Sequence, residues 1–370
     1  MTGPRTHNTM AVRALQLYAG PKAFAHIRKN GLNPQDVHTI AAAAGGPKGL
    51  VMGHLDRFLF GHWLAQSQHP VDLIGASIGA WRMATACMPD VAAGFARLEH
   101  DYIHQHYETP PGRRRPTPAH VSETFGSTIA AFYQGHEQQV TQHARYRLHI
   151  VTSRGRHLLR TERPLVTPLG YVGAFASNAL HRKAMGAWLE RVVFSSHREE
   201  ALPFATTDYR TRRVRLRAAN FRPALQASCS IPFVLQAVHH IPDAPAGAYW
   251  DGGITDYHLH LNYAAARPDG VVLYPHFQKQ VVPGWLDKGL QWRHKATGFL
   301  DTVLLLAPRP EWVQTLPNGK LPDRNDFVHY GNDVAARVRA WSATTSASQQ
   351  LADEFAEWLR QPDPAQVLPL

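Results

Sequence analysis

Cysteine is nearly absent from this chain of 370 residues, which contains only Cys87 and Cys229. Two cysteines cannot form the disulfide framework that stabilises small secreted domains. Apolar runs are short as well, and none approaches the roughly 18–20 residues that span a bilayer. The N-terminal stretch MTGPRTHNTMAVRALQLYAG lacks the uninterrupted apolar core of a secretory signal. These absences predict a cytoplasmic protein.

Acidic residues are the second shortage. The chain has 28 Asp and Glu against 39 Lys and Arg, which gives a formal net charge of +11. Such an excess favours anionic partners, among them phospholipid headgroups, nucleic acid and acidic substrates. The contents of 44% hydrophobic and 18% charged residues are ordinary for a globular protein with a sizeable core.

The spacing of apolar residues predicts an α/β fold. Residues 37–46 are typical of a buried strand that runs into a glycine turn, and residues 50–63 have the spacing of an amphipathic helix. A second strand over 71–76 and a helix from Ile78 repeat this arrangement, so at least part of the sheet should be parallel. Helical spacing also recurs over 178–193. Further buried or half-buried strands are expected over 147–153, 212–221, 270–277 and 301–310.

The chain shows no internal repeat and no clear linker. We therefore expect a single domain over residues 1–370, with a core over about 37–280 that carries the motifs described below. Insertions near 89–145 and 155–190 and a C-terminal helical extension over about 332–360 would complete this domain.

The segment Gly75-Ala76-Ser77-Ile78-Gly79 joins the second predicted strand to its helix. A G-x-S-x-G sequence between a strand and a helix is typical of a nucleophile elbow. The glycines are needed because the sharp turn brings backbone segments too close for side chains. The serine would be held at strained dihedral angles, with its hydroxyl exposed above the sheet.

Two other glycine turns are candidates for a chemical role. Residues 44–49, Ala-Gly-Gly-Pro-Lys-Gly, follow the first predicted strand, and the backbone amides of such a turn can stabilise a negative charge. Their spacing does not match the phosphate-binding G-x-x-x-x-G-K-[ST] loop. Asp251 precedes Gly252 and Gly253 after a short apolar run. Taken alone, either turn could serve packing only.

Taken in order, the three turns resemble the motifs of the patatin-like phospholipases. That family has a G-G-G-x-[KR]-G loop, a G-x-S-x-G nucleophile and a D-G-[GA] aspartate, and residues 44–49, Ser77 and Asp251 stand at the matching places. Residues 224–238 contain Ala-Ser-Cys-Ser-Ile-Pro, which is similar to the family's A-S-x-A-x-P stretch. The resemblance spans about residues 39–254.

The resemblance implies a three-layer α/β/α fold with a mostly parallel central sheet and no metal or cofactor. It also implies a catalytic dyad, in which Ser77 attacks an ester carbonyl and Asp251 accepts the hydroxyl proton. Backbone amides of the first glycine turn would form the oxyanion hole, and two glycines would shape the elbow. These residues are Gly45, Gly46, Lys48 and Gly49 for the hole, and Gly75 and Gly79 for the elbow.

Three positions depart from the family pattern. Ala44 stands where the loop has its first glycine, and an alanine forced to positive φ would cost about 1–3 kcal/mol. Pro47 removes one potential amide donor. Ser230 replaces the second alanine of the A-S-x-A-x-P stretch.

The implied activity is hydrolysis of carboxyl esters, with a phospholipid or another acyl ester as substrate. The positive charge would favour peripheral association with an anionic membrane. Residues 284–300 mix Trp285 and Trp292 with Lys288, which is typical either of an interfacial segment or of tryptophans that are simply part-buried. Lys48 would orient the loop, attract an anionic headgroup, or be a solvated residue at the start of a helix.

A catalytic triad and a metal site are alternative interpretations. An esterase or thioesterase of the α/β-hydrolase type would combine Ser77 and Asp251 with His258 or His260. If the stretch after Asp251 is a strand, Asp256 and the two histidines lie on one face and could hold a metal, although a solvated strand face is the more ordinary interpretation.

A basic nucleic-acid-binding protein is the third alternative. It would use the arginines at 113–115 and within 210–217 to contact phosphates. No zinc-binding spacing, helix-turn-helix signal or aromatic-basic pattern accompanies them, so we expect no nucleic acid partner.

Overall fold

The computed structural model describes residues 12–110, 112, 113, 115–196 and 201–370. Within this part of the chain, ten strands form one sheet: β1 (Leu15–Ala19), β2 (Val37–Ala42), β3 (Val71–Ala76), β4 (Tyr146–Gly155), β5 (Leu189–Ser195), β6 (Thr211–Arg215), β7 (Tyr249–Asp251), β8 (Val271–Pro275), β9 (Val303–Pro308) and β10 (Val367–Pro369). Their order is β10-β1-β9-β8-β2-β3-β4-β5-β6, and β7 pairs with β4. Most neighbouring strands are parallel, and the antiparallel pairs are β1–β9, β4–β5 and β4–β7.

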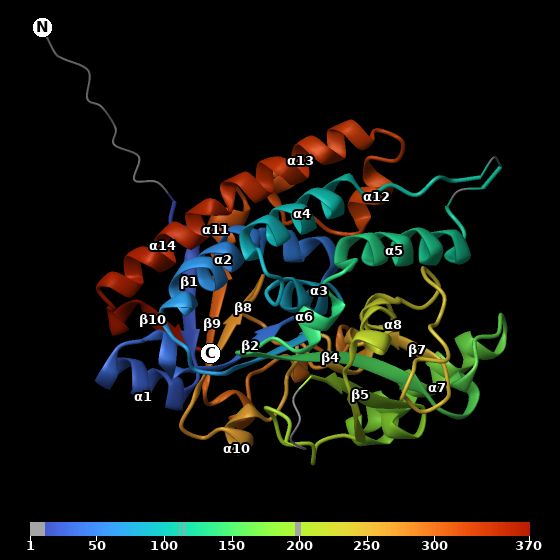
Figure 1. Ribbon diagram of the computed structural model, residues 1–370, viewed down its shortest axis with the longest axis horizontal. Helices are drawn as coiled ribbons and strands as arrows, with labels where there is room; N and C mark the ends of the chain where they lie inside the picture. The colour runs from blue at the N-terminus through green and yellow to red at the C-terminus, as the bar shows by residue number, and fades with distance from the viewer. Residues whose placement is uncertain (1–11, 111, 114, 197–200) are drawn as a thin grey trace, which may run out of the picture.

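Helices flank this sheet. They are α1 (Pro21–Asn30), α2 (Gly53–Phe58), α3 (Ile78–Thr85), α4 (Val91–His104), α5 (Pro118–Tyr133), α6 (Glu137–Thr141), α7 (Val166–Leu180), α8 (Ala218–Cys229), α9 (Gly253–Asp256), α10 (Tyr263–Ala266), α11 (Pro310–Val313), α12 (Asn325–His329), α13 (Val334–Ala347) and α14 (Gln349–Arg360). Figure 1 shows α4, α13 and α14 on one side of the sheet and α1, α7 and α10 on the other. The expected α/β fold, with helical layers around a mostly parallel sheet, is confirmed.

The strands predicted over 37–46, 71–76 and 147–153 are β2, β3 and β4 of the structure, and those near 270–277 and 301–310 are β8 and β9. Their nearly continuous burial explains why an apolar run was a sufficient signal. The tail over 332–360 is helical, as α13 and α14. The pair β1 and β10 was not predicted, because both strands are short and lie at one edge of the sheet.

The helix expected over 50–63 is not a uniform α-helix. It consists of the 3₁₀-helix η2 (Gly46–Met52), the six-residue helix α2, and the π-helix η3 (Leu59–Trp63). The amphipathic spacing was correct, since its apolar residues are buried except for Phe58, which is partly buried and packs against the core. The backbone type changes because glycines and Pro47 at the start of the segment disfavour a regular α-helix.

Helical spacing over 178–193 was misleading, because α7 ends at Leu180 and β5 begins at Leu189. The charged residues that imitate a polar helix face, Glu190 and Arg191, are in fact buried within β5. Arg191 binds Asp256 through two hydrogen bonds of 2.6 and 2.7 Å. Because these charged residues are buried and paired, the polarity pattern of the sequence does not indicate the strand β5.

Two other stretches differ from expectation. The strand predicted over 212–221 ends at Arg215, and α8 begins at Ala218 after the Arg217 amide donates to the Asn220 side chain at 2.8 Å. Residues 256–260 form no strand: Asp256 ends α9, and residues 257–260 follow it in a turn. Within the described residues, no helix has the combination of length and apolarity that crossing a bilayer demands.

A buried ion pair ties α3, the helix after the G-x-S-x-G turn, to α2. Arg82 donates to both carboxylate oxygens of Asp56, at 2.6 and 2.8 Å, and both side chains are almost fully buried. Arg82→Met should lower the free energy of unfolding by about 3–5 kcal/mol, because Asp56 would remain buried without a partner. Chemical denaturation followed by circular dichroism measures this change.

The matched control for that measurement is Arg217→Met. The Arg217 guanidinium pairs with Asp243 at 3.3 Å at the surface, where both side chains are exposed. The control should lose less than about 1 kcal/mol. Equal losses in the two variants would contradict the structural importance of the buried pair.

Candidate active site

Strand β4 brings the two candidate catalytic residues together. Along one edge it pairs with β3 as far as Ala76 opposite Val151, and from the next residue it pairs with β7, where Asp251 stands opposite Thr152. Strand β5 occupies the other edge of β4 over the same residues. Ser77, which follows β3, therefore meets Asp251 although 174 positions separate the two in the chain.

Ser77 occupies the turn between β3 and α3 with φ 56° and ψ −129°, a strained conformation for a residue with a side chain. Close backbone contacts explain both flanking glycines. A Cβ on Gly75 would lie 2.5 Å from the Ala80 backbone, and one on Gly79 would lie 1.9 Å from the Ala42 carbonyl oxygen. Such contacts are what the elbow motif predicts at these positions.

The Ser77 hydroxyl donates a hydrogen bond of 2.7 Å to Oδ2 of Asp251. The second carboxylate oxygen, Oδ1, accepts the Gly253 amide at 2.7 Å. Burial raises the pKa of Asp251 above its ordinary value, against the opposing effects of Arg324, of these two hydrogen bonds and of Lys288. We refer to Ser77 and Asp251 as the candidate dyad, since a hydroxyl bonded to a buried carboxylate can act as a nucleophile with its base.

The C-terminal end of α8 and the residue that follows it hold both members of the candidate dyad. The Ser77 amide donates to the hydroxyl of Ser228 at 2.9 Å, and that hydroxyl donates to the Val151 carbonyl at 2.7 Å. The Ser230 carbonyl accepts the Asp251 amide at 2.8 Å. Ser228 thus positions the elbow, a role that the A-S-x-A-x-P resemblance alone did not assign. Ser230 contributes through its backbone, so the departure at its side chain leaves this contact intact.

The glycine turn after β2 carries the candidate oxyanion amides. Ala44 does not have a positive φ, and its amide donates to the Tyr257 carbonyl at 3.0 Å, so the strain considered for an alanine there does not arise. Gly46 has φ 57°, and a Cβ on Gly45 would lie 2.5 Å from the Phe277 ring. The amides of Gly45 and Gly46 donate to no acceptor within the described part of the chain, which leaves both donors unengaged.

This turn packs against the other two motifs. Gly49, within η2, faces Ile78 so closely that a Cβ would lie 3.0 Å from that side chain. A Cβ on Gly253 would lie 2.8 Å from the methyl group of Ala44. The three turns that are far apart in the sequence therefore converge at the end of β3.

A narrow pocket opens beside Asp251. Its walls are mainly apolar and include Ile231, Pro232, Ile254 and Trp285. Arg324 also lines it, from the loop before α12, and was missed by sequence reasoning because no motif or periodic pattern accompanies it.

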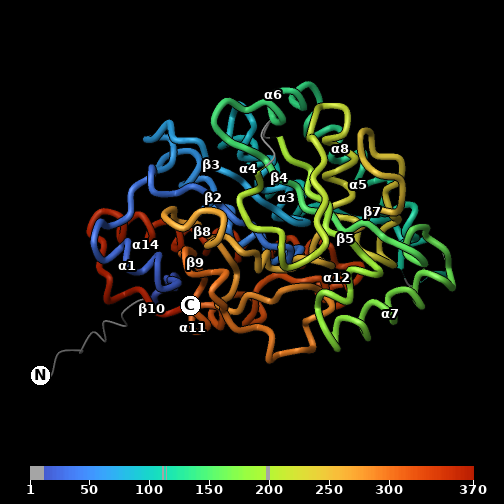
Figure 2. The backbone as a smooth tube through the Cα atoms, turned by 90° about the horizontal axis from the view of Figure 1, so that it is seen from below, coloured from blue at the N-terminus to red at the C-terminus, as the bar shows by residue number. Residues whose placement is uncertain are grey.

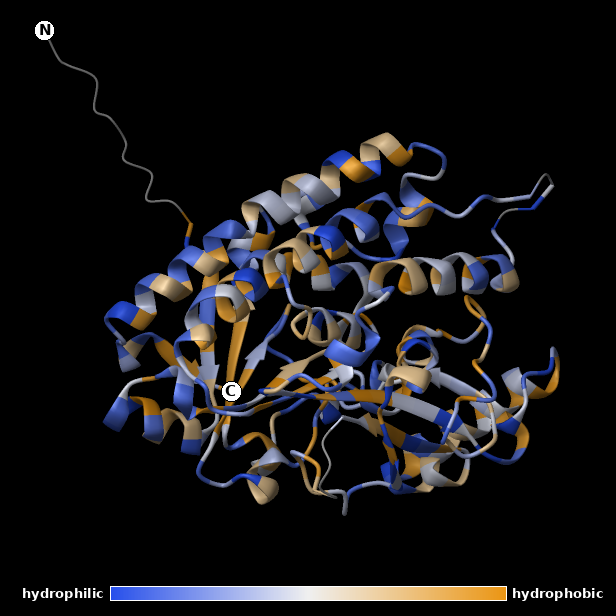
Figure 3. Ribbon diagram, viewed as in Figure 1, coloured by the Kyte–Doolittle hydropathy of each residue, from blue (hydrophilic) through white to orange (hydrophobic). Residues whose placement is uncertain are grey.

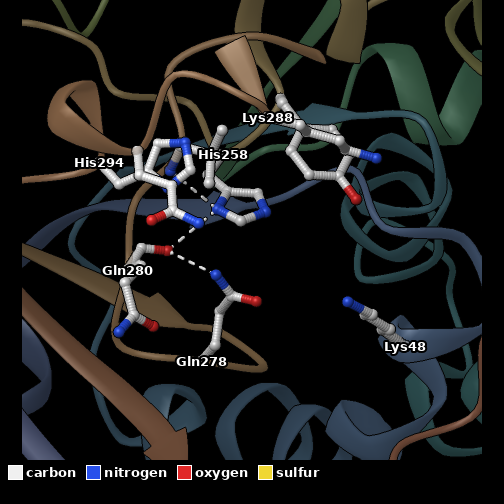
Figure 4. Close-up of a pocket in the computed structure, with 9 residues that line it drawn as sticks. Lys48, His258, Gln278, Gln280, Lys288 and His294 are labelled. Atoms are coloured by element: carbon white, nitrogen blue, oxygen red, sulfur yellow. Dashed lines mark hydrogen bonds between the residues drawn. The ribbon is translucent and has the colours of Figure 1, made fainter. Parts of the chain in front are cut away.

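A second cavity, of about 550 Å³, adjoins this pocket through Tyr257, which lines both. Figure 4 shows the ammonium of Lys48 directed into the open space that Lys288, His258 and Gln278 also border. Within the described residues, neither lysine lies within ion-pair distance of a carboxylate. The cavity therefore presents two unneutralised ammonium groups next to the candidate dyad.

These lysines are only partly solvated. Lys48 lies over the Phe277 ring at 5.2 Å, and Lys288 lies over the Tyr257 ring at 4.0 Å. Burial lowers the pKa of Lys48, and burial together with the charges of Arg324 and Lys48 lowers the pKa of Lys288 to about 8. Lys48 thus stands at the start of a helix, η2, as one alternative expected, but it is only partly solvated.

The histidines proposed for a triad make other contacts. His258 Nδ1 accepts the Val282 amide at 3.0 Å, and His260 Nε2 lies 3.3 Å from the Thr297 hydroxyl. Burial lowers the pKa of both histidines, to about 4 for His260. Across the described residues, neither histidine hydrogen-bonds a member of the candidate dyad.

The metal-site interpretation is wrong for the part of the chain that the structure describes, where no cluster of three or more His, Cys, Asp or Glu side chains could hold a metal ion. Asp256 pairs with Arg191 instead. A solvated strand face was also incorrect, because Asp256 and His258 are buried.

The arginine clusters are partly neutralised. Glu190 accepts hydrogen bonds from Arg210 at 2.9 Å and from Arg212 at 3.2 Å. Arg114, the centre of the 113–115 cluster, lies outside the described residues. Paired arginines are less available to phosphates, which weakens the case for a nucleic-acid surface over 210–217.

A scan of the chain against protein-family models found no match. A search of the curated proteins also found no match. The resemblance to the patatin-like phospholipases therefore rests on the motifs alone.

The packing of the elbow can be tested at Gly79. Gly79→Ala should lower the free energy of unfolding by about 1–3 kcal/mol or more, because the new methyl group collides with the Ala42 carbonyl and the backbone must move. Denaturant titration measures the change. Gly61→Ala is the matched control, since a Cβ there meets nothing within 4 Å. If both variants were equally stable, the tight contact at the elbow would be refuted.

Proposed function

We propose that this protein is a serine-dependent lipid acyl hydrolase that cleaves carboxyl esters through an acyl-enzyme. The observation that carries the proposal is the 2.7 Å hydrogen bond from the strained Ser77 to the buried carboxylate of Asp251. The glycine turn over 44–49 beside this pair supports it. So does the resemblance of the three motifs to those of the patatin-like phospholipases.

In the proposed reaction, Asp251 accepts the hydroxyl proton as Ser77 Oγ bonds to the ester carbonyl carbon. The charge that develops on the carbonyl oxygen is stabilised by amides of the glycine turn, with Gly45 and Gly46 as the unengaged donors. Asp251 then returns its proton to the leaving alcohol as the carbon–oxygen bond breaks. Asp251 then takes a proton from water as the water oxygen bonds to the acyl carbon. It returns that proton to Ser77 Oγ as the bond between Oγ and the acyl carbon breaks, which releases the acid and restores the serine.

The surroundings of the candidate dyad favour an ester with an apolar chain and an anionic group. The pocket at Asp251 has mainly apolar walls, but its volume of about 10 Å³ is too small for a hydrocarbon chain, so the chain would lie across its mouth. The adjoining cavity, with Lys48 and Lys288, suits an anion. Phospholipids combine both features. The formal net charge of +11 supports peripheral association of a cytoplasmic enzyme with an anionic membrane.

A triad enzyme of the α/β-hydrolase type is the less favoured alternative, because His258 and His260 have other partners. A thioester substrate would follow the same steps on the candidate dyad. A nucleic-acid-binding function has no supporting contact beyond the arginines already described.

Labelling with a fluorophosphonate probe tests the nucleophile. The wild-type protein should form a covalent adduct, and Ser77→Ala should form none. In Asp251→Asn the labelling rate should fall by at least about 100-fold, because the amide cannot accept the hydroxyl proton. Intact-protein mass spectrometry over time measures the adduct.

Ser127→Ala is the control for this labelling, since Ser127 is an exposed serine on α5. It should be labelled at the wild-type rate. Adduct formation that persists in Ser77→Ala would refute the assignment of the nucleophile.

Preference for an anionic ester should depend on Lys288. Lys288→Met is expected to reduce the ratio of kcat/KM for a monoacyl glycerophosphate to kcat/KM for a neutral short-chain ester by about tenfold or more, since a charged hydrogen bond is lost. Lys295→Met, at an exposed lysine outside the cavity, should leave the ratio unchanged. An unchanged ratio in Lys288→Met would exclude the cavity as the anion site.

The same ratio should depend on pH. Lys288 has a pKa of about 8, so its charge, and with it the preference for the anionic ester, should decline as pH rises through about 8. At the acid end, hydrolysis of both esters should fall as Asp251 takes up a proton, at a pH above the ordinary aspartate range. Rate profiles for the two substrates against pH measure both effects.

A further inference from the structure

Helix α7 exposes an apolar face to solvent. Residues 166–180 include no charged side chain, although one side of the helix faces outward. Leu169 and Val172 are 64% and 65% exposed on that side, and Leu180 is 87% exposed. Figure 2 places α7 at the periphery of the molecule, and Figure 3 shows hydrophobic turns along it. An exposed helix face normally carries charges, so this face needs an explanation.

The apolar surface extends onto a neighbouring loop. Tyr171, on the inner side of α7, packs against the ring of Phe233 with centroids 5.7 Å apart, and Phe233 is itself 53% exposed. We define the α7 patch by its exposed apolar members, Leu165, Leu169, Val172, Phe175, Leu180 and Phe233. Proteins rarely expose a contiguous apolar surface of this kind unless it binds something.

The charged side chains around the α7 patch are mainly basic. Arg160 and Arg163 precede the helix, Lys183 follows it, and all three are exposed. Glu162 is the only acidic residue between 157 and 183, and it accepts the Ala237 amide at 2.9 Å. An apolar centre with a basic rim is complementary to a membrane surface that contains anionic lipids.

The α7 patch also adjoins the candidate active site. The inner side of α7 packs in one core cluster with Trp250 and Ile254, which flank the Asp251 turn. Phe233 directly follows Pro232, which lines the pocket at Asp251. A surface that contacts the α7 patch would therefore lie close to the mouth of that pocket.

We propose that the α7 patch docks this protein onto an anionic phospholipid membrane, with α7 lying in the plane of the interface. The apolar side chains would insert below the headgroups while the basic rim contacts lipid phosphates. The docking would present ester lipids to Ser77, and in this respect the inference rests on the proposed function. Docking itself is measurable without catalysis.

Co-sedimentation with vesicles tests the docking, in a Ser77→Ala background that prevents hydrolysis. The protein should bind vesicles that contain phosphatidylglycerol more tightly than vesicles of phosphatidylcholine alone. Val172→Glu should reduce the partition coefficient about tenfold or more, because a carboxylate replaces an inserted apolar group. Val328→Glu is the matched control: Val328 is 72% exposed on α12, outside the patch, and should bind like the parent. Thermal unfolding shows that both variants are folded.

A fluorescent label measures the contact directly. Cys87 and Cys229 are both buried, so Leu169→Cys supplies an accessible thiol for an environment-sensitive dye. Emission should shift to the blue and intensify when anionic vesicles are added. The same dye on Val328→Cys should not respond.

Absence of vesicle binding, equal losses in Val172→Glu and Val328→Glu, or binding indifferent to anionic lipid would each overturn the proposal. So would a dimer, detected by light scattering, that Val172→Glu dissociates, since the α7 patch would then bind a second copy of the chain. Fluorophosphonate labelling of the wild type is a separate measurement. Docking without labelling would refute the proposed hydrolase while leaving the membrane surface supported.

Discussion

The division of one edge of β4 between two strands is the constraint on which the candidate site depends. β3 occupies that edge as far as Val151, and β7 occupies it from Thr152 onward, so the turns that leave the sheet at this junction carry Ser77 and Asp251. The junction is tight, since a Cβ on Gly252 would lie 2.1 Å from the Val151 carbonyl oxygen. Register matters here because a shift of one residue in β7 would turn the Asp251 side chain to the opposite face of the sheet. The chemistry that we propose is thus determined by strand pairing before any side chain is considered.

Several destabilising features are concentrated at this junction. Ser77 has a strained backbone, the carboxyl group of Asp251 is desolvated, and Lys48 and Lys288 face the same cavity without a carboxylate partner in the described residues. Each of these lowers the stability of the folded state. By contrast, two buried arginines of the core are paired with carboxylates, Arg82 with Asp56 and Arg191 with Asp256. The contrast supports a functional origin for the unpaired groups, because residues that serve only the fold are normally satisfied.

Sequence reasoning identified the strands whose burial is continuous and the turns whose glycines are sterically required, and both kinds of signal are local. It failed where a distant partner changes the meaning of a residue. Glu190 and Arg191 indicated a helix because their ion-pair partners lie far along the chain. The positions of Arg324 and Ser228 beside the candidate dyad could not be inferred, since each is fixed by packing between elements remote in sequence. The outward face of α7 was also unpredictable, because an uncharged, apolar helix is ordinarily read as part of a core.

The pairing of β1 with the edge strand β10 has a consequence for how the chain folds. Leu17 pairs with Val367, and the Leu370 amide donates to the Ala19 carbonyl at 3.0 Å, so residues separated by almost the whole sequence are joined there. Contacts of such long range form slowly, because a large loop must close before they are gained. During biosynthesis the outer edge of β1 therefore remains unpaired until residues near 370 have emerged. For that interval it offers a template for pairing with other nascent chains, and a chaperone that shields this strand would protect the protein at its most aggregation-prone stage.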